Sequence, residues 1–271
     1  RVAGTHYMTD CAAGTTQPTL PSTSTWLMRV TTASGAIAAV VSLQSGNPVL
    51  STTVGMGKNV KECGAKVDGV TDDTVALNTC LATFPHVFVP AGTLLHSGTI
   101  TLNVGNRLSG VGIGLTDTAG VSGLSPRLAA TTLRYTGTGD AIAVLYTVVH
   151  NCQCIIENML IRSTTGAVGI HLKNVADAWV FRLAINGQNA DGSAIAGFTT
   201  AGVWLDGTAG GCPGDCAMIT TRITESWIYA NAGHGVLLQG VNNTSAINFT
   251  GTKIQGNTLT GMFINSRAQG I

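Results

Sequence analysis

From about residue 140 onward, short segments that alternate apolar and polar residues recur along the chain. Each begins with a glycine and continues as apolar, any residue, apolar; the four segments are GIHL (169–172), GVWL (202–205), GVLL (235–238) and GMFI (261–264). Such alternation is typical of β-strands, whose successive side chains point to opposite faces. The segments are 33, 33 and 26 residues apart. Repeats of this length predict a solenoid whose neighbouring coils bury a shared core.

A second strand ends at an isoleucine in each repeat, and the four residues are Ile161, Ile185, Ile228 and Ile254. The gaps from these isoleucines to the next glycine are 8, 17, 7 and 7 residues, so the long gap marks an insertion at 186–198. Another insertion, at 206–216, follows the GVWL segment. We expect both insertions to project from the wall of the solenoid, where loops often carry function.

The alternation also assigns side chains to the two faces of each strand. If Ile170 and Leu172 point into the core, His171 points outward. The same reasoning predicts an outward column formed by His171, Trp204, Leu237 and Phe263. On the second strand the isoleucines point inward, and two outward columns flank them: Leu160, Ala184, Trp227 and Lys253, then Arg162, Asn186, Tyr229 and Gln255. One step further back, three more residues are expected to point outward: Asn158, Arg182 and Glu225.

The segment NVKECGAKVDGVTDDTVALNTC (59–80) combines a short strand, a turn and the start of an amphipathic helix. We expect the strand to begin at Val60 and the helix to cover about 72–84. Apolar residues spaced by four and three positions form one helical face: Leu77, Leu81 and Phe84. Three residues offer side-chain oxygens to the free amides of the helix start: Thr71, Asp72 and Asp73. The first coil of a solenoid exposes strand edges and core, so this helix is predicted to cover it.

This block resembles the opening of the right-handed parallel β-helices of the pectate-lyase superfamily, especially the form seen in bacteriophage tailspikes. There, an element of the form fGAkgDGvtDDT is followed by a helix and a strand of the form vyvPaGtY. The matching residues here are Gly64, Ala65, Asp68, Gly69, Asp72, Asp73 and Thr74, then Val89, Pro90, Ala91 and Gly92. Cys63 replaces the usual aromatic residue before the first glycine. The resemblance implies an all-β fold, a right-handed parallel β-helix with a short N-terminal capping helix and a small N-terminal region.

Residues 1–56 differ in composition from the rest and are rich in Thr, Ser and Ala. Strand-like stretches at 26–30 and 36–41 flank a turn signal at Ser34-Gly35. We therefore predict a β-rich or extended region at 1–56 and a parallel β-helix at 57–271. In tailspikes the region before the β-helix is a virion-attachment or neck segment. No capping pattern follows the last repeat strand, so we expect the solenoid to continue beyond Ile271 or to be covered by other chains.

Composition and charge narrow the function classes. Only 10% of the residues are charged and the formal net charge is +1, which gives no electrostatic footprint for nucleic acid or an anionic membrane. The longest apolar run, at 35–43, is too short to span a bilayer. The chain also lacks nucleotide-loop, HExxH and GxSxG motifs, and the signatures of pectate lyases and mannuronan epimerases. We expect no cofactor, no nucleic-acid partner and no membrane insertion.

The acidic turn and the cysteines could suggest metal sites, but structural roles explain them better. Asp68, Asp72 and Asp73 lack the ligand spacing and final Glu of a calcium loop, so we expect them to stabilise the helix start. No second pair accompanies Cys152 and Cys154 at zinc-finger spacing, so we expect buried structural thiols and no metal. A further pair brackets a turn and could equally be bonded or free: Cys212 and Cys216.

Candidate chemistry lies among the outward residues beside the insertions. Hydrolysis of a glycosidic bond usually needs two carboxyl groups, whereas elimination needs a base and a cation that neutralises the uronate. Glu225 is the first candidate for a catalytic or sugar-orienting carboxylate, with Asp206 or Asp191 as its partner. The residues predicted to bind the sugar are Arg182, Trp227 and Tyr229. The alternative interpretation is a solvated wall whose charges have no catalytic role.

The resemblance implies a phage tailspike or tail fibre in the virion tail that binds a bacterial surface polysaccharide, capsule or lipopolysaccharide, and depolymerises it. Two alternatives stay open: a non-catalytic structural or adhesive tail protein, and a secreted cellular polysaccharide lyase or glycosidase. Tailspikes are parallel homotrimers, so we expect the outward column of Trp204 to face a neighbouring chain in preference to stacking on a glycan. The N-terminal region is expected to contact other tail proteins.

Overall fold

A computed structural model describes residues 29–33, 36–41, 57–113, 131–188, 194–208 and 218–269. The chain divides into two compact units, Arg1–Thr52 and Thr53–Ile271. In the first unit, β1 (Arg29–Ala33) and β2 (Ala36–Val41) pair as an antiparallel hairpin. The hairpin agrees with the turn signal and with the strand predicted at 36–41. Residues 26–28, which begin the other predicted strand, lie outside the described residues.

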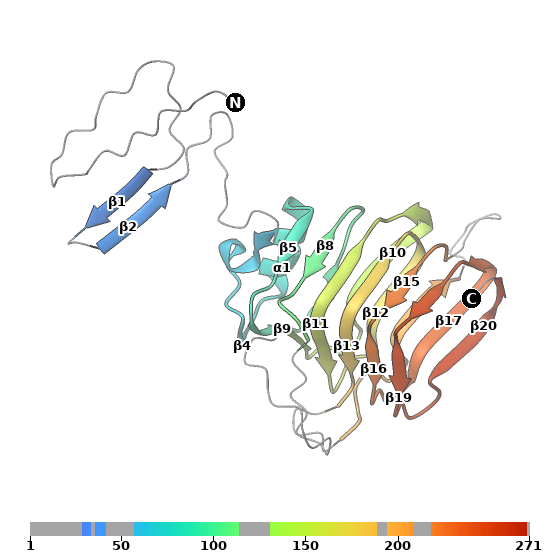
Figure 1. Cartoon of the computed structure of the whole chain (residues 1–271). Coiled ribbons are helices and arrows are strands. Elements are labelled where there is room, and N and C mark those ends of the chain that lie inside the picture. Colours follow the sequence, from blue (N-terminus) through green and yellow to red (C-terminus); the bar gives the residue numbers. More distant parts are fainter. Residues whose placement is uncertain are drawn as a thin grey trace, which may run out of the picture. The chain divides into compact units, whose positions relative to one another are not determined.

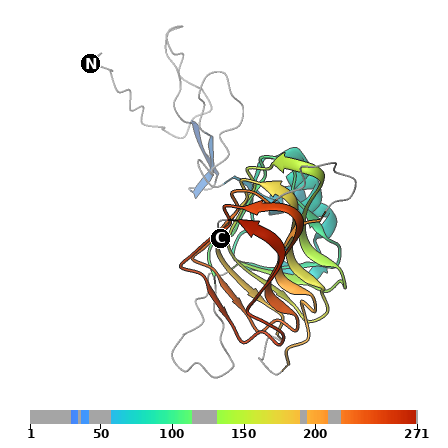
Figure 2. The ribbon, with the colours of Figure 1, turned by 90° about the vertical axis from the view of Figure 1, so that its right-hand side faces the viewer.

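The second unit is a parallel β-helix whose coils have three walls around one apolar core (Figures 1 and 2). Walls 1 and 2 share two long strands, β11 (Ile155–Ser163) and β13 (Trp179–Asn186). Each of these strands gives its first half to wall 1 and its second half to wall 2. Wall 3 is a separate sheet of six strands. The predicted fold class, an all-β parallel solenoid with one short helix, is confirmed.

The remaining strands are distributed over the walls in chain order. Wall 1 contains β3 (Lys58–Asn59), β5 (His86–Phe88), β8 (Arg107–Ser109), β15 (Arg222–Thr224) and β18 (Asn248–Thr250). Wall 2 contains β4 (Asp68–Asp72), β6 (Gly92–His96), β9 (Thr131–Tyr135), β16 (Trp227–Tyr229) and β19 (Lys253–Gln255). Wall 3 contains β7 (Ile100–Thr101), β10 (Asp140–Asn151), β12 (Val168–Ala176), β14 (Ala201–Gly207), β17 (His234–Ser245) and β20 (Met262–Gln269).

Successive coils pair in parallel and keep the register that the repeats predict. In wall 2 the aligned inward residues are Ile161, Ile185, Ile228 and Ile254. In wall 3 the aligned outward residues are His171, Trp204, Leu237 and Phe263. Sequence spacing therefore gave the correct alignment of both strands in every repeat.

The repeated glycine of wall 3 is explained by its contact with the repeated isoleucine of wall 2. A Cβ atom at Gly202 would lie 2.7 Å from Ile228 Cγ2, and one at Gly235 would lie 2.5 Å from Ile254 Cγ2. Such Cβ atoms would also meet the backbone carbonyl of the next coil, at 2.9 Å for Gly202. Only glycine fits here, because the closest obstacles include backbone atoms that cannot rotate away.

A bend separates wall 1 from wall 2, and one residue of each coil has a left-handed backbone there. These corner residues are Asn158, Arg182, Glu225 and Gly251, with φ of 58°, 48°, 49° and 63°. Asn and Gly adopt this conformation readily, whereas Arg and Glu cost about 1 kcal/mol or more each. The side chains of Arg182 and Glu225 are more than half exposed. They point outward, as predicted, because of the bend.

Helix α1 (Thr74–Thr83) covers the first coil, as predicted (Figure 1). Leu77 and Leu81 are buried in the core, and Phe84 packs against it. The strand predicted from Val60 is wrong, because β3 ends at Asn59 and a 3-10 turn (Val60–Cys63) follows. The Asn59 side chain accepts a hydrogen bond from the Lys61 amide at 3.0 Å, which favours the turn.

The acidic turn before the helix stabilises backbone amides. Asp73 stands at the N-cap position, but its buried carboxylate accepts hydrogen bonds from the amides of Lys66 and Val67, both at 2.8 Å. Asp72 accepts from the Thr74 amide at 2.9 Å, as predicted for the helix start. Hydrogen bonds from the side chains of Ser97 and Thr74 lower the pKa of Asp72 to about 2.

The cysteines correct the sequence prediction in one place and add a disulfide that it did not include. Cys63 forms a disulfide with Cys80, which ties the 3-10 turn to α1. Cys152 and Cys154 are buried as predicted, but they are bonded to each other and are not free thiols. The left-handed backbone of Gln153, with φ of 49°, brings their Cα atoms to 5.0 Å. Two more cysteines lie outside the described residues: Cys212 and Cys216.

Several residues of the outward columns are covered although they point away from the core. His171 and Leu237 are each 8% exposed, Leu160 is 2% exposed and Ala184 is fully buried. Neighbouring strands lie only about 4.7–4.9 Å apart, so large side chains above and below cover these residues. Phe263, in contrast, is 42% exposed.

Candidate functional site on wall 3

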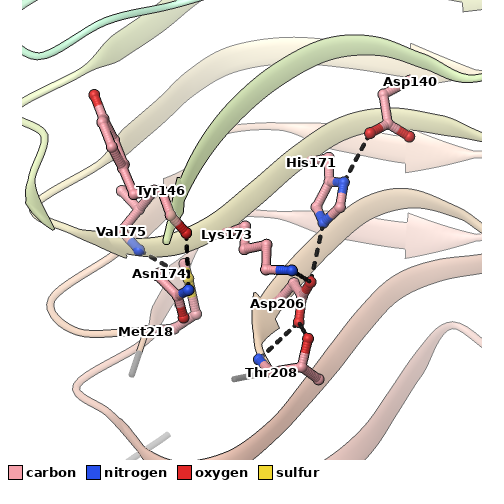
Figure 3. A network of polar contacts seen from close by, with 9 residues as sticks. All are labelled: Asp140, Tyr146, His171, Lys173, Asn174, Val175, Asp206, Thr208 and Met218. Atoms are coloured by element: carbon pink, nitrogen blue, oxygen red, sulfur yellow. Dashed lines mark hydrogen bonds and ion pairs between the residues drawn. The ribbon is translucent and has the colours of Figure 1, made fainter. Parts of the chain in front are cut away.

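A network of charged side chains lies on the outer face of wall 3 and is centred on His171 (Figure 3). His171 Nδ1 lies 2.7 Å from Asp140 Oδ2, and His171 Nε2 lies 3.4 Å from Asp206 Oδ2. These residues come from β10, β12 and β14, which follow one another in the sheet. Parallel pairing thus brings together residues that are 31 and 35 positions apart in the chain.

Asp206 is the most buried member of the network, at 2% exposed. Its Oδ1 accepts hydrogen bonds from the backbone amide and the hydroxyl of Thr208. Its Oδ2 also faces Lys173 Nζ at 3.7 Å. Lys173 and Asp140 reach solvent with 30% and 23% of their side chains. A buried carboxylate held by a neighbouring hydroxyl, an imidazole and an ammonium group is typical of a functional site.

The network shifts the pKa values of two of its members. Burial disfavours the charged form of His171, but the hydrogen bonds to Asp140 and Asp206 outweigh burial and raise the pKa of His171. Burial would raise the pKa of Asp206, but hydrogen bonds from His171 and Thr208 and the charge of Lys173 lower it. The site therefore favours an imidazolium ion beside an ionised carboxylate.

We expect NMR titration of the His171 ring to give a pKa above 6.5, its ordinary value. Asp140→Asn should lower this pKa, because it removes one of the two carboxylates. Since the pKa is raised on folding, the stabilisation is fully present below the unfolded value and is lost as pH rises through the folded value. Melting temperatures across this range check the sign. An unchanged His171 pKa in Asp140→Asn would contradict the network, and Asp177→Asn, an exposed change elsewhere, is the control.

Two rows of side chains run along wall 3 through this network. The first contains His171 and Trp204, whose rings stack with centroids 4.2 Å apart and planes 3° from parallel. The second row, two positions later on each strand, consists of Lys173, Asp206, Gln239 and Asn265. One face of the Trp204 ring is therefore covered by His171, and the polar row beside it supplies hydrogen-bonding groups at the spacing of the coils.

The structure does not bring all the predicted site residues together. Asp206 lies on wall 3, whereas Glu225 lies at the corner of walls 1 and 2, where Arg182 Nε donates to Glu225 Oε2 at 2.8 Å. Trp227 and Tyr229 lie on wall 2 with ring centroids 4.5 Å apart. Asp191 lies outside the described residues. The predicted residues thus belong to separate surfaces.

The His171 ring lies between the carboxylates of Asp140 and Asp206, and each of its nitrogens faces one of them. The network thus contains a carboxylate that can act as a base and an imidazolium that can donate a proton. Sequence reasoning missed Asp140 and gave His171 no chemical role. The repeats aligned His171 with Trp204, but they did not show that Asp140 lies beside the ring.

A match to a protein-family model shows the family to which this chain belongs. Residues 57–263 match the model described as "Rhamnogalacturonase A/epimerase, pectate lyase-like". The chain belongs to this pectate lyase-like family. Its coils are accordingly those of a right-handed parallel β-helix, as the opening motif predicted. No curated protein sequence matches the chain.

Solved structures share the fold of this pectate lyase-like chain at low sequence identity. Pre-mature gene product 12 of bacteriophage phi29 matches with a TM-score of 0.56 and 16% identity, covering 80% of this chain and 30% of that one. ORF18 of Geobacillus virus E2 has a TM-score of 0.49 and 17% identity, and the match covers 86% of this chain and 48% of that one. The catalytic unit of the GH87 α-1,3-glucanase of Streptomyces thermodiastaticus has a TM-score of 0.47 and 15% identity, and the match covers 86% of this chain and 45% of that one. The chain spans less than half the length of each.

The described part of the chain contains no group of three His, Cys, Asp or Glu side chains placed to hold a metal ion. Within the same residues, no helix has the length and apolar character needed to cross a membrane.

Proposed function

We propose that this pectate lyase-like chain is part of a bacteriophage tail appendage and binds and hydrolyses a bacterial surface polysaccharide on wall 3. The observation that carries the proposal is the buried network of Asp140, His171 and Asp206 beside the Trp204 ring. The opening motif, which resembles that of tailspikes, and the fold shared with the phi29 protein support the virion assignment.

In this proposal the glycan runs along the helix axis over the two rows of wall 3. The exposed part of the Trp204 ring contacts the apolar side of one sugar residue, and the polar row binds its hydroxyl groups. Asp206, which the network keeps ionised, takes a proton from the attacking water, and His171, which the network keeps protonated, donates its proton to the leaving glycosidic oxygen. Asp140 keeps His171 protonated and orients its ring.

The reaction class can be tested directly with the intact chain. Capsule and lipopolysaccharide preparations, rhamnogalacturonan, polymannuronate and α-1,3-glucan form the substrate panel. New reducing ends without ultraviolet absorption indicate hydrolysis, an absorbing unsaturated product indicates elimination, and a changed uronate signal in NMR without shortening indicates epimerisation. The proposal expects hydrolysis with inversion at the anomeric carbon. Elimination or epimerisation would refute it.

In this proposal the corner residues Arg182 and Glu225 lie away from the glycan on wall 3. We expect Glu225→Gln to leave polysaccharide binding within about twofold of the parent, because it breaks only an exposed ion pair, which contributes about 1 kcal/mol or less. Turnover at saturating substrate should stay within about tenfold of the parent, which steady-state kinetics can check. Arg182→Gln, which breaks the same pair, is the matched variant. A loss of turnover by several orders of magnitude in Glu225→Gln alone would move the catalytic centre to the corner.

Binding without cleavage is the second candidate function. It is favoured by the burial of Asp206, whose two oxygens already accept hydrogen bonds within the chain. Release of no product from any polymer that binds would favour this function. The homotrimer stays a prediction, and light scattering on the purified protein tests it. If the Trp204 column faces a neighbouring chain in that trimer, as predicted, the glycan cannot bind on the same column.

A further inference from the structure

The outer face of wall 2 carries cationic and aromatic residues, away from the network on wall 3. One row in register across the coils consists of Arg134, Arg162, Asn186, Tyr229 and Gln255. The row beside it consists of Thr132, Leu160, Ala184, Trp227 and Lys253. From β9 to β19, the described outward residues of this wall include three cations and no Asp or Glu.

Arg134 and Arg162 are aligned directly on the neighbouring strands β9 and β11. The described ion pairs of arginine involve Arg107 and Arg182, so neither member of this pair has an acidic partner there. Arg162 Nε is buried and has no hydrogen-bond partner. Like charges on aligned strands destabilise a sheet, and an unpaired buried donor adds to that cost. An anion bound between the two guanidinium groups would remove the repulsion between them.

Aromatic rings and a third cation extend this surface toward the next coils. Trp227 and Tyr229 lie with their ring centroids 4.5 Å apart, and Lys253 Nζ lies 5.2 Å from the centre of the Trp227 ring. Both rings are partly exposed. Ring faces bind the apolar faces of sugars, while the cations bind their acidic groups. A neutral glycan would leave the arginine pair unused.

We propose that wall 2 binds an acidic glycan, one whose sugars carry carboxylate or phosphate groups, at a surface separate from wall 3. Arg134 and Arg162 bind one oxyanion, and the forked geometry of guanidinium allows paired hydrogen bonds to it. Trp227 and Tyr229 bind sugar residues further along the polymer. This inference rests on the proposed function only in taking a polysaccharide as the ligand.

Affinity electrophoresis of the full chain tests the surface, with polygalacturonate, carboxyl-reduced polygalacturonate and phosphomannan in the gel. We expect Arg162→Gln, Arg134→Gln and Trp227→Ala each to weaken binding of the acidic polymer about tenfold. Added salt should weaken binding of the parent chain strongly. Arg222→Gln removes an exposed arginine on wall 1 and should change binding less than twofold. The carboxyl-reduced polymer should bind the parent chain as weakly as the acidic one binds Arg162→Gln.

Each outcome of this experiment decides the proposal. Binding of phosphomannan alone supports it and identifies phosphate as the oxyanion, and binding of polygalacturonate alone identifies carboxylate. Detectable binding of polygalacturonate that its carboxyl-reduced form matches, equal loss in Arg222→Gln, or binding of neither acidic polymer overturns it. The proposal is also overturned if single-stranded DNA displaces the chain from the acidic polymer as effectively as free acidic polymer does. Wall 2 binding without any cleavage product refutes only the hydrolysis on wall 3, and hydrolysis with unimpaired binding by Arg162→Gln refutes only this surface.

Discussion

Leu81→Asp is expected to lower the free energy of unfolding by more than about 4 kcal/mol, because it places a charge where a buried leucine fills the first coil. Leu81 is 2% exposed and lies in the apolar core beneath α1. For a domain of this size, the melting temperature should fall by at least about 10 °C. Thermal melting followed by circular dichroism measures the effect.

Val75→Asp is the matched control, because it makes a similar change on the same helix at a residue that is 77% exposed. It should change the stability by less than about 0.5 kcal/mol. Leu81→Ala should give an intermediate loss of about 2–5 kcal/mol if the site is part of a packed core. Equal melting temperatures for Leu81→Asp and Val75→Asp would mean that α1 does not cover the coil.

Asp206→Asn is expected to lower turnover by about 10²–10⁴-fold while the β-helix stays folded, because the amide cannot act as a base. Measuring reducing ends with the polymer that the intact chain cleaves gives the effect. Asp140→Asn should also lower turnover, because it removes the carboxylate that keeps His171 protonated. Melting temperatures of both variants separate lost chemistry from lost fold.

Asp177→Asn is the control for this prediction. It makes the same chemical change at an exposed residue whose left-handed backbone asparagine also adopts. Its turnover should match the parent within about twofold, as a surface change away from substrate does. If Asp206→Asn and Asp177→Asn cleave equally well, wall 3 is not the catalytic surface.

The fold could be predicted because its repeat unit is visible in single residues. Each coil needs a glycine where the backbone of the next coil approaches, and an isoleucine that packs against it, so a glycine such as Gly202 and an isoleucine such as Ile228 recur in each repeat. The helix over the first coil could be predicted for the same kind of reason, since Leu77 and Leu81 face one way. These features depend on neighbours that the periodicity itself identifies.

The network on wall 3 could not be predicted in full, because it depends on where coils of unequal length place their ends. Asp140 begins β10 and does not occupy the position that aligns with His171, which is Ala143. Alternation therefore gave no reason to pair the two. The disulfide between Cys63 and Cys80 was missed because the 3-10 turn that holds Cys63 was predicted as a strand.

The aligned isoleucines of wall 2 determine which substitutions in this protein influence one another. Ile185 has Ile161 on one side and Ile228 on the other, each on a strand about 4.8 Å away. Changes at adjacent members share a cavity, so their effects on stability should not add. Ile161 and Ile228 are two strands apart and act almost independently. A substitution that restores the stability lost in one coil is therefore expected in an adjacent coil, and substitutions in more distant coils act almost independently.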